Sequence, residues 1–228
     1  MRTRSTRTCL ALAVLLVACD GGKAEKPAPV AEKTAPPVEQ PAADKPAEKP
    51  ADTRVLADSG LGVGGKFKAF DIVNCETGDT YCQVCRFGSS PKIMAVGTLD
   101  DPAFGEDIKN LDALVQKYGE DKLKAFAVIT DIKDGKSVTP TEGRDELQAR
   151  VKALREQLGV KIPLVIPAAA EGKADFDDYY NITKSRTLMF ADGSNAVKYS
   201  GVAPADLSEL NAAIQQVLGV ADPAAKTG

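Results

Sequence analysis

Three cysteines that lie close together in this sequence are the side chains best suited to chemistry: Cys75, Cys82 and Cys85. The last two are spaced as Cys-x-x-Cys, a pattern used for thiol redox exchange, for a structural disulfide or for part of a metal site. Arg86 follows directly, so this is not the Cys-x-x-Cys-His site of a c-type haem. We expect any chemistry of the folded part of the chain to depend on these thiols.

Histidine is absent from all 228 residues. Its absence excludes catalysis by Ser-His-Asp or Cys-His groups, and it excludes zinc or copper held by imidazole. Acid-base chemistry would therefore fall to Asp, Glu, Lys or a thiolate. A net charge of −3 with 5% aromatic residues gives neither a basic surface nor a stacking platform, so nucleic acid is not an expected partner.

The local sequence around the cysteines predicts a β-hairpin. Residues 66–74 alternate loosely between apolar and polar side chains, which indicates a strand. Glu76-Thr-Gly-Asp79 supplies turn residues, and Thr80-Tyr-Cys82 could return as a second short strand. Such a hairpin would bring Cys75 and Cys82 close to one another.

The rest of the folded part predicts strands that alternate with helices, and therefore an α/β domain with helices packed on a central sheet. A closing hairpin at residues 187–200 implies mixed strand directions. We expect the strand at 161–166 toward an edge, because Pro163 cannot donate to a ladder. The other predicted strands are 92–98 and 124–130, and the predicted helices are 102–118, 147–158, 175–182 and 204–218.

This order of elements resembles the thioredoxin-like fold, as used by peroxiredoxins and membrane-tethered thiol-disulfide reductases. The segment from Tyr180 to Gly193, with its strand and Asp-Gly turn, is the most specific local likeness. The resemblance covers roughly residues 65–218. It implies an α/β, thioredoxin-like domain whose mixed central sheet is flanked by helices, with an N-terminal β-hairpin extension.

Two departures from that resemblance concern the usual active site. The family carries its Cys-x-x-Cys after the first central strand, at the start of the next helix, and this sequence has Thr98-Leu-Asp-Asp-Pro102 there. The family also places a cis-proline before a later strand, and Arg186 holds that place here. Arg186 is therefore either an anion-binding residue or one member of a salt bridge.

Three interpretations of the cysteines remain open. In the first, Cys82 and Cys85 are catalytic and exchange disulfides, with Cys75 as a resolving or alternative partner. In the second, the domain is a non-catalytic binding module stapled by one structural disulfide, as oxidising compartments favour. In the third, the three thiolates bind a soft metal, although a fourth ligand is not evident. The sequence does not give the pairing, and it implies no cofactor.

The beginning of the chain predicts a targeting signal. Arg2, Arg4 and Arg7 precede a short apolar run at Leu10–Ala18, which is typical of a signal peptide. Leu16-Val-Ala-Cys19 resembles the bacterial lipobox, and this resemblance implies cleavage before Cys19 and its lipidation. We therefore expect a bacterial cell-envelope protein that faces the periplasm or the exterior and binds the membrane through the lipid on Cys19.

The expected organisation is a signal peptide at 1–18, a tether at 19–54, a thioredoxin-like domain at 55–219 and a flexible tail at 220–228. The tether alternates Ala, Pro, Lys and Glu and lacks the apolar side chains needed to offset ordering entropy. The expected partners besides the membrane are envelope proteins that carry thiols or disulfides.

Overall fold

The computed structural model describes residues 54–169 and 175–220. Nearly all of the predicted signal peptide, tether and tail lies outside these residues, so Cys19 and those boundaries stay predictions. Within the described ranges, no helix is both long and apolar enough to cross a membrane.

A β-hairpin begins the sheet. Its strands are β1 (Asp71–Asn74) and β2 (Thr80–Cys82), and the short helix α1 (Gln83–Phe87) follows at once. The central strands are β3 (Lys92–Gly97), β4 (Lys124–Ile129) and β7 (Leu164–Pro167), with β8 (Thr187–Ala191) and β9 (Val197–Val202) closing the sheet. A separate small hairpin pairs β5 (Asp131–Lys133) with β6 (Lys136–Val138). The remaining helices are α2 (Pro102–Tyr118), α3 (Arg144–Leu158), α4 (Asp175–Tyr180) and α5 (Ser208–Leu218).

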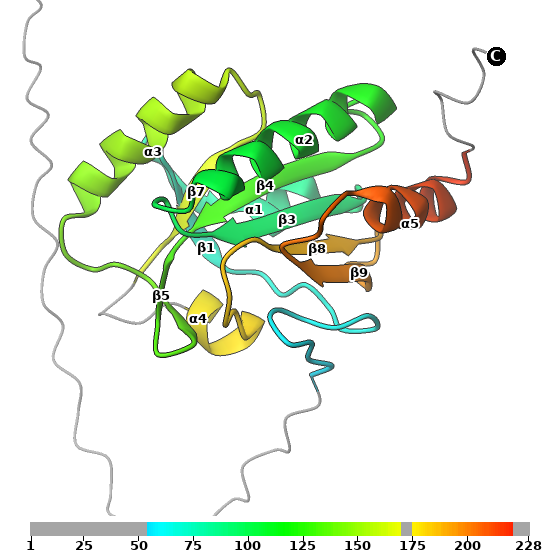
Figure 1. Ribbon diagram of the computed structural model, residues 1–228, viewed down its shortest axis with the longest axis horizontal. Helices are drawn as coiled ribbons and strands as arrows, with labels where there is room; N and C mark the ends of the chain where they lie inside the picture. Colours follow the sequence, from blue (N-terminus) through cyan, green and yellow to red (C-terminus); the bar gives the residue numbers. More distant parts are fainter. Residues whose placement is uncertain (1–53, 170–174, 221–228) are drawn as a thin grey trace, which may run out of the picture. The chain divides into compact units, whose positions relative to one another are not determined.

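The seven-stranded sheet has the order β2-β1-β7-β4-β3-β8-β9 (Figure 1). Strands β3, β4 and β7 run parallel, whereas the hairpins at both ends pair antiparallel, so the predicted mixed directions are confirmed. The prediction that the strand near Pro163 lies at an edge is wrong. Pro163 precedes β7 and uses its carbonyl to accept the Ala127 N–H at 2.9 Å, while the β1–β2 hairpin extends the sheet beyond β7.

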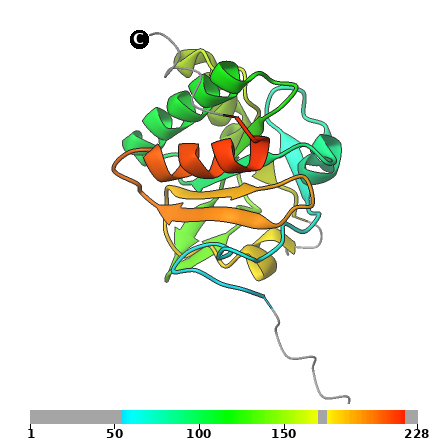
Figure 2. The same ribbon diagram turned by 90° about the vertical axis from the view of Figure 1, so that its right-hand side faces the viewer.

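Helices cover both faces of the sheet and bury two apolar cores. Helices α2, α3 and α5 pack on one face, around Phe104, Ile108 and Leu111. Helices α1 and α4 and the segment leading into β1 pack on the other face, around Val84, Phe126 and Tyr180. Figure 2 shows α2 and α5 side by side over their face, where Tyr118 Oη donates to Asn211 Oδ1 at 2.6 Å. The central strands are buried on both sides, which explains their continuous apolar sequences.

Helix α2 confirms the helix predicted over residues 102–118, and local groups set both of its ends. The Asp101 side chain caps it by accepting the Ala103 N–H at 3.1 Å, Pro102 occupies the first turn, and Gly119 ends it at a positive φ of 94°. By contrast, the strand predicted over 66–74 is shorter, since only residues 71–74 join the ladder. Helix α1 and the β5–β6 strands were not predicted, because segments this short carry no measurable periodicity.

Candidate functional site

Cys82 and Cys85 form a disulfide, with their Cα atoms 5.2 Å apart. Cys82 ends β2 and serves as the N-cap of α1, while Cys85 lies within that helix. The strand-to-helix transition therefore brings the two sulfurs together. The bridge forms part of the link between the edge hairpin and the central strand β3.

The two cysteines of this bridge have different surroundings. Cys85 is exposed, whereas Cys82 is half-buried and packs against the apolar core beneath α1. The Cys85 backbone N–H lies 3.1 Å from Cys82 Sγ and donates to it. A hydrogen bond of this kind stabilises negative charge on sulfur, so Cys82 is suited to be the sulfur that leaves or waits as a thiolate.

Cations near the bridge have other partners. The Arg86 guanidinium lies 4.9 Å from the centre of the Tyr81 ring and stacks over it. The buried Lys92 ammonium donates to the Gly88 carbonyl at 2.7 Å and to Asn195 Oδ1 at 2.6 Å. Burial lowers the pKa of Lys92, and nearby Asp192 opposes that shift. Lys92 therefore fixes the end of α1.

The structure does not bring Cys75 to the bridge. The hairpin register places Cys82 opposite Asp71, and Cys75 lies in the turn at the other end of the hairpin. Cys75 also packs into the core on the α2 side of the sheet, whereas Cys82 packs on the α1 side. The expected closeness of these two cysteines is thus wrong, because the turn begins at Cys75.

Burial also makes Cys75 an unreactive thiol. Its side chain is 6% exposed, and burial raises its pKa from an ordinary 9.0 to about 12. A thiol that stays protonated at neutral pH is a poor nucleophile and a poor metal ligand. The three thiolates needed for a soft-metal site are accordingly not assembled, and the described residues contain no cluster of three metal-ligating side chains.

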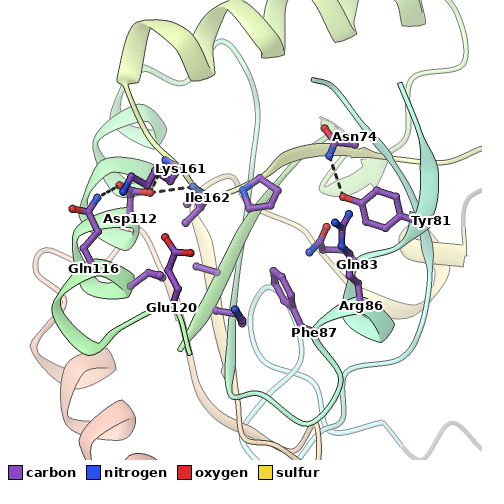
Figure 3. Close-up of a pocket in the computed structure, with 14 residues that line it drawn as sticks. Asn74, Tyr81, Gln83, Arg86, Phe87, Asp112, Gln116, Glu120, Lys161 and Ile162 are labelled. Carbon is purple, nitrogen blue, oxygen red and sulfur yellow. Dashed lines mark hydrogen bonds between the residues drawn. The ribbon is translucent and has the colours of Figure 1, made fainter. Parts of the chain in front are cut away.

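A pocket of about 420 Å³, which sequence reasoning missed, is lined by Gln83 and Arg86, the residues that directly follow the two bridged cysteines. Figure 3 shows Tyr81, Gln83, Arg86 and Phe87 along one wall, and the opposite wall comes from the end of α2, the start of β4 and the segment that precedes β7. Gln83, which separates the two cysteines in sequence, is 1% exposed. The one sequence signal for this pocket is the polar Gln83 directly after Cys82, with Tyr81 two residues before it and Phe87 four residues after it.

Comparison with known proteins identifies the fold. The chain is similar to a solved structure named as a thiol:disulfide interchange protein of Chlorobium tepidum, with a TM-score of 0.54 at 16% identity over 70% of this chain and 99% of that one. A thiol-disulfide isomerase of Corynebacterium glutamicum gives 0.53 at 11% identity over 69% and 98%. The chain has the thioredoxin-like fold. No family model and no curated protein matches the sequence.

A third solved structure, of a protein named as a disulfide isomerase of Bacteroides thetaiotaomicron, gives a TM-score of 0.51 at 12% identity over 70% of this chain and 91% of that one. The thioredoxin-like chain described here has Thr98–Asp101 after its central strand β3, directly before α2. Its cysteine bridge instead precedes β3, at the strand's amino end. The Cys-x-x-Cys is thus displaced from the place that the thioredoxin-like resemblance implies.

An ion pair occupies the region where the thioredoxin-like resemblance implies a cis-proline. Arg186 has a positive φ of 59°, and no peptide bond in the described residues is cis. Its guanidinium donates twice to the buried Asp107 carboxylate of α2, at 2.7 and 2.9 Å. Hydrogen bonding to Asp107 raises the pKa of Arg186 further above its ordinary value. Of the two interpretations of Arg186, an anion-binding residue or one member of a salt bridge, the structure supports the salt bridge.

Proposed function

We propose that this protein exchanges thiols and disulfides through Cys82 and Cys85. The observation that carries the proposal is the bridge itself, because it joins an exposed Cys85 to a Cys82 whose sulfur accepts a backbone N–H. A sulfur open to attack and a stabilised leaving sulfur are the two parts that exchange requires. Three solved structures with a similar fold carry names of thiol-disulfide exchange proteins, which also supports the proposal.

The exchange runs through a mixed disulfide on Cys85. A thiolate of a partner attacks Cys85 Sγ, a new sulfur-sulfur bond forms, and the Cys82–Cys85 bond breaks with its electron pair on Cys82. A second partner thiolate then attacks the partner sulfur of that mixed disulfide. The partner leaves with its own disulfide, and the protein holds two thiols. The reverse sequence reduces a partner disulfide and restores the bridge.

A binding module with a structural disulfide is the second candidate function. It is favoured by the absence of cysteine from Thr98–Asp101, the place where the resemblance implies an active site. In that case the bridge would only fasten the β1–β2 hairpin to α1. The two candidates differ in one measurable property, which is whether partner thiols open the bridge.

The proposed setting is the bacterial cell envelope, with the domain facing the periplasm or the exterior and held at the membrane by lipid on Cys19. The supporting observation is Leu16-Val-Ala-Cys19 after a basic leader and a short apolar run. A disulfide in the folded part fits an oxidising compartment. Its proposed partners are envelope proteins with thiols or disulfides.

Trapping tests this function. Reduced Cys82→Ser protein is mixed with a disulfide-bonded peptide, and its intact mass is measured. We expect a stable mixed disulfide on Cys85, because the sulfur that would resolve it is gone. The Cys85→Ser variant should form far less adduct, since Cys82 is half-buried, and either change should abolish turnover of the peptide disulfide.

Cys75→Ser serves as the matched control, because its thiol lies in the core on the other side of the sheet. It should leave peptide reduction unchanged. Peptide reduction by the Cys82→Ser, Cys85→Ser double variant at the wild-type rate would contradict the proposal and leave the binding module as the better account.

A further inference from the structure

The pocket lined by helix α1 contains a buried amide without a hydrogen-bond partner among the described residues. Neither Nε2 nor Oε1 of Gln83 has a hydrogen-bond partner among the described residues, although the side chain is 1% exposed. A buried polar group left unpaired costs roughly 1–3 kcal/mol, so native chains retain few of them. Because Gln83 lines an open pocket, a bound ligand can supply the hydrogen bonds that its amide lacks.

Other polar side chains of the pocket are already bonded within the protein. Asp112 Oδ1 accepts the backbone N–H groups of Lys161 and Ile162 at 2.7 and 3.0 Å, and its other oxygen accepts from Gln116. Asn74 donates to Tyr81 Oη at 3.1 Å. Gln83 is therefore the buried polar side chain in this pocket that retains both its donor and its acceptor for a bound molecule.

The chemistry of a carboxamide defines the ligand. Its Nε2 donates and its Oε1 accepts, which matches the carbonyl and N–H groups of a peptide backbone. The pocket's size of about 420 Å³ falls within the range of small-ligand sites. The rings of Tyr81, Phe87 and Pro163 offer apolar surface for a neighbouring side chain, and charges of both signs lie at the rim on Arg86, Glu120 and Lys161.

We infer that this pocket binds the peptide group next to a partner's reactive cysteine, with Gln83 as the residue that recognises it. The inference rests on the proposed exchange function, and it names the substrate class as cysteine-containing peptide rather than simple thiol. Gln83 directly follows Cys82, and Arg86, which also lines the pocket, directly follows Cys85, so a peptide held there contacts the helix that carries the bridge. The peptide group can come from a protein segment or from a small peptide thiol such as glutathione.

The test compares the full-length protein with its Gln83→Met variant, which keeps the side-chain size and removes the amide. Binding is measured by calorimetry with a capped pentapeptide whose central cysteine is replaced by serine and which carries one phenylalanine. Opening of the Cys82–Cys85 bridge is measured by alkylation and mass spectrometry with three thiols: the cysteine form of that peptide, glutathione and 2-mercaptoethanol. Gln216→Met, an exposed glutamine on α5 outside the pocket, is the control.

We expect Gln83→Met to weaken peptide binding about tenfold, the effect of losing one hydrogen-bonding group. The peptide thiol should open the bridge of Gln83→Met more slowly by a similar factor, while 2-mercaptoethanol should open it at the wild-type rate. The Gln216→Met control should match wild type in peptide binding and with all three thiols. A slower reaction with glutathione as well would assign the pocket to small peptide thiols, and an effect confined to the pentapeptide would assign it to protein segments.

Two results would overturn the inference. Absence of pentapeptide binding to the wild-type protein at millimolar concentration would do so whatever the redox results. So would a Gln83→Met variant that slows all three thiols equally, because that would mean an effect on the bridge and not on recognition. Failure of the proposed function looks different: peptide would bind through Gln83, and none of the thiols would open the bridge.

Discussion

The three cysteines of the folded part differ in what surrounds each sulfur, and the roles proposed for them rest on that difference. Cys85 is exposed, Cys82 is half-buried with an N–H donor, and Cys75 is enclosed in the core. The Cys-x-x-Cys spacing suggested Cys82 and Cys85 as the exchanging pair, but the sequence left the pairing of the three cysteines open. The environment of each sulfur was not predictable, because it depends on the face of the sheet to which each residue turns.

Cys75 gives a stability prediction at alkaline pH. Burial raises its pKa from 9.0 to about 12, so both states hold the proton below pH 9 and the full stability is present there. Above pH 9 the unfolded chain loses its proton and the folded chain does not. Its contribution to the free energy of unfolding therefore falls by about 1.4 kcal/mol per pH unit between 9 and 12.

Urea unfolding of wild type and Cys75→Ala at pH 8, 9 and 10 checks this prediction. We expect the variant to be less stable at pH 8, where it lacks the buried side chain, and the gap to narrow as the pH rises above 9. A gap that stays constant over this range would show that the folded and unfolded thiols titrate alike.

The position of Cys75 also shows a limit of reading residues from sequence. Glu76 to Asp79 look like the turn, but the closing bond runs from the Asn74 N–H to the Asp79 carbonyl at 2.9 Å, so the turn begins at Cys75. A shift of one residue reverses the face on which a side chain lies. The turn residues alone do not set this register, because it depends on how strands β1 and β2 pair with each other.

At the level of elements, helix α2 packs very closely on strand β3. A Cβ added to Gly97 of β3 would lie 2.7 Å from the ring of Phe104 in α2, too close for any carbon. A Cβ added to Gly105 in the same helix would meet Leu158 at 3.5 Å, an ordinary contact. The two glycines therefore have opposite roles, although neither has a positive φ.

Gly97→Ala should destabilise the protein by about 1–3 kcal/mol, because the ring or the strand must move. Gly105→Ala should stabilise it by roughly 0.5–1 kcal/mol, because alanine favours the helix and fits the space. Thermal unfolding followed by circular dichroism compares them. If both variants changed the free energy of unfolding in the same direction, the close packing of α2 on β3 would be refuted.

Elements with a long periodic pattern were predictable, and short or context-dependent ones were not. Helix α2 was predicted with its bounds, since the residues that set them, Asp101, Pro102 and Gly119, each act locally. The edge position expected for the strand near Pro163 was wrong, because strand order depends on distant partners: the β1 hairpin pairs with β7 from far along the chain. Helix α1, which carries Cys85, was too short to predict.

At the level of the whole molecule, the order of elements predicted the thioredoxin-like fold, because alternating strands and helices leave few ways to cover a mixed sheet. The sequence also predicted that the cysteines lie away from the implied active site. It could not show that the helix carrying the bridge lines a pocket, since that pocket combines residues from α1, α2, β4 and the segment before β7.

The proposed lipid anchor gives a prediction for the whole chain. Cys19→Ser should prevent lipidation and release the protein from the membrane fraction of a bacterium that expresses it. The domain itself should keep its circular dichroism spectrum and its bridge, because Cys19 is outside it in sequence. Fractionation with an antibody against the domain measures this, and unchanged membrane retention of the variant would argue against the anchor.

The reduction potential of the Cys82–Cys85 bridge tests the central claim most directly. The protein is equilibrated in redox buffers of known potential, its thiols are trapped, and the state of each cysteine is mapped by mass spectrometry. A protein that exchanges disulfides should open this bridge at roughly −120 to −270 mV, the range of dedicated oxidoreductases, with Cys75 unmodified throughout. A bridge that stays closed below about −300 mV would contradict the account and identify it as a structural staple.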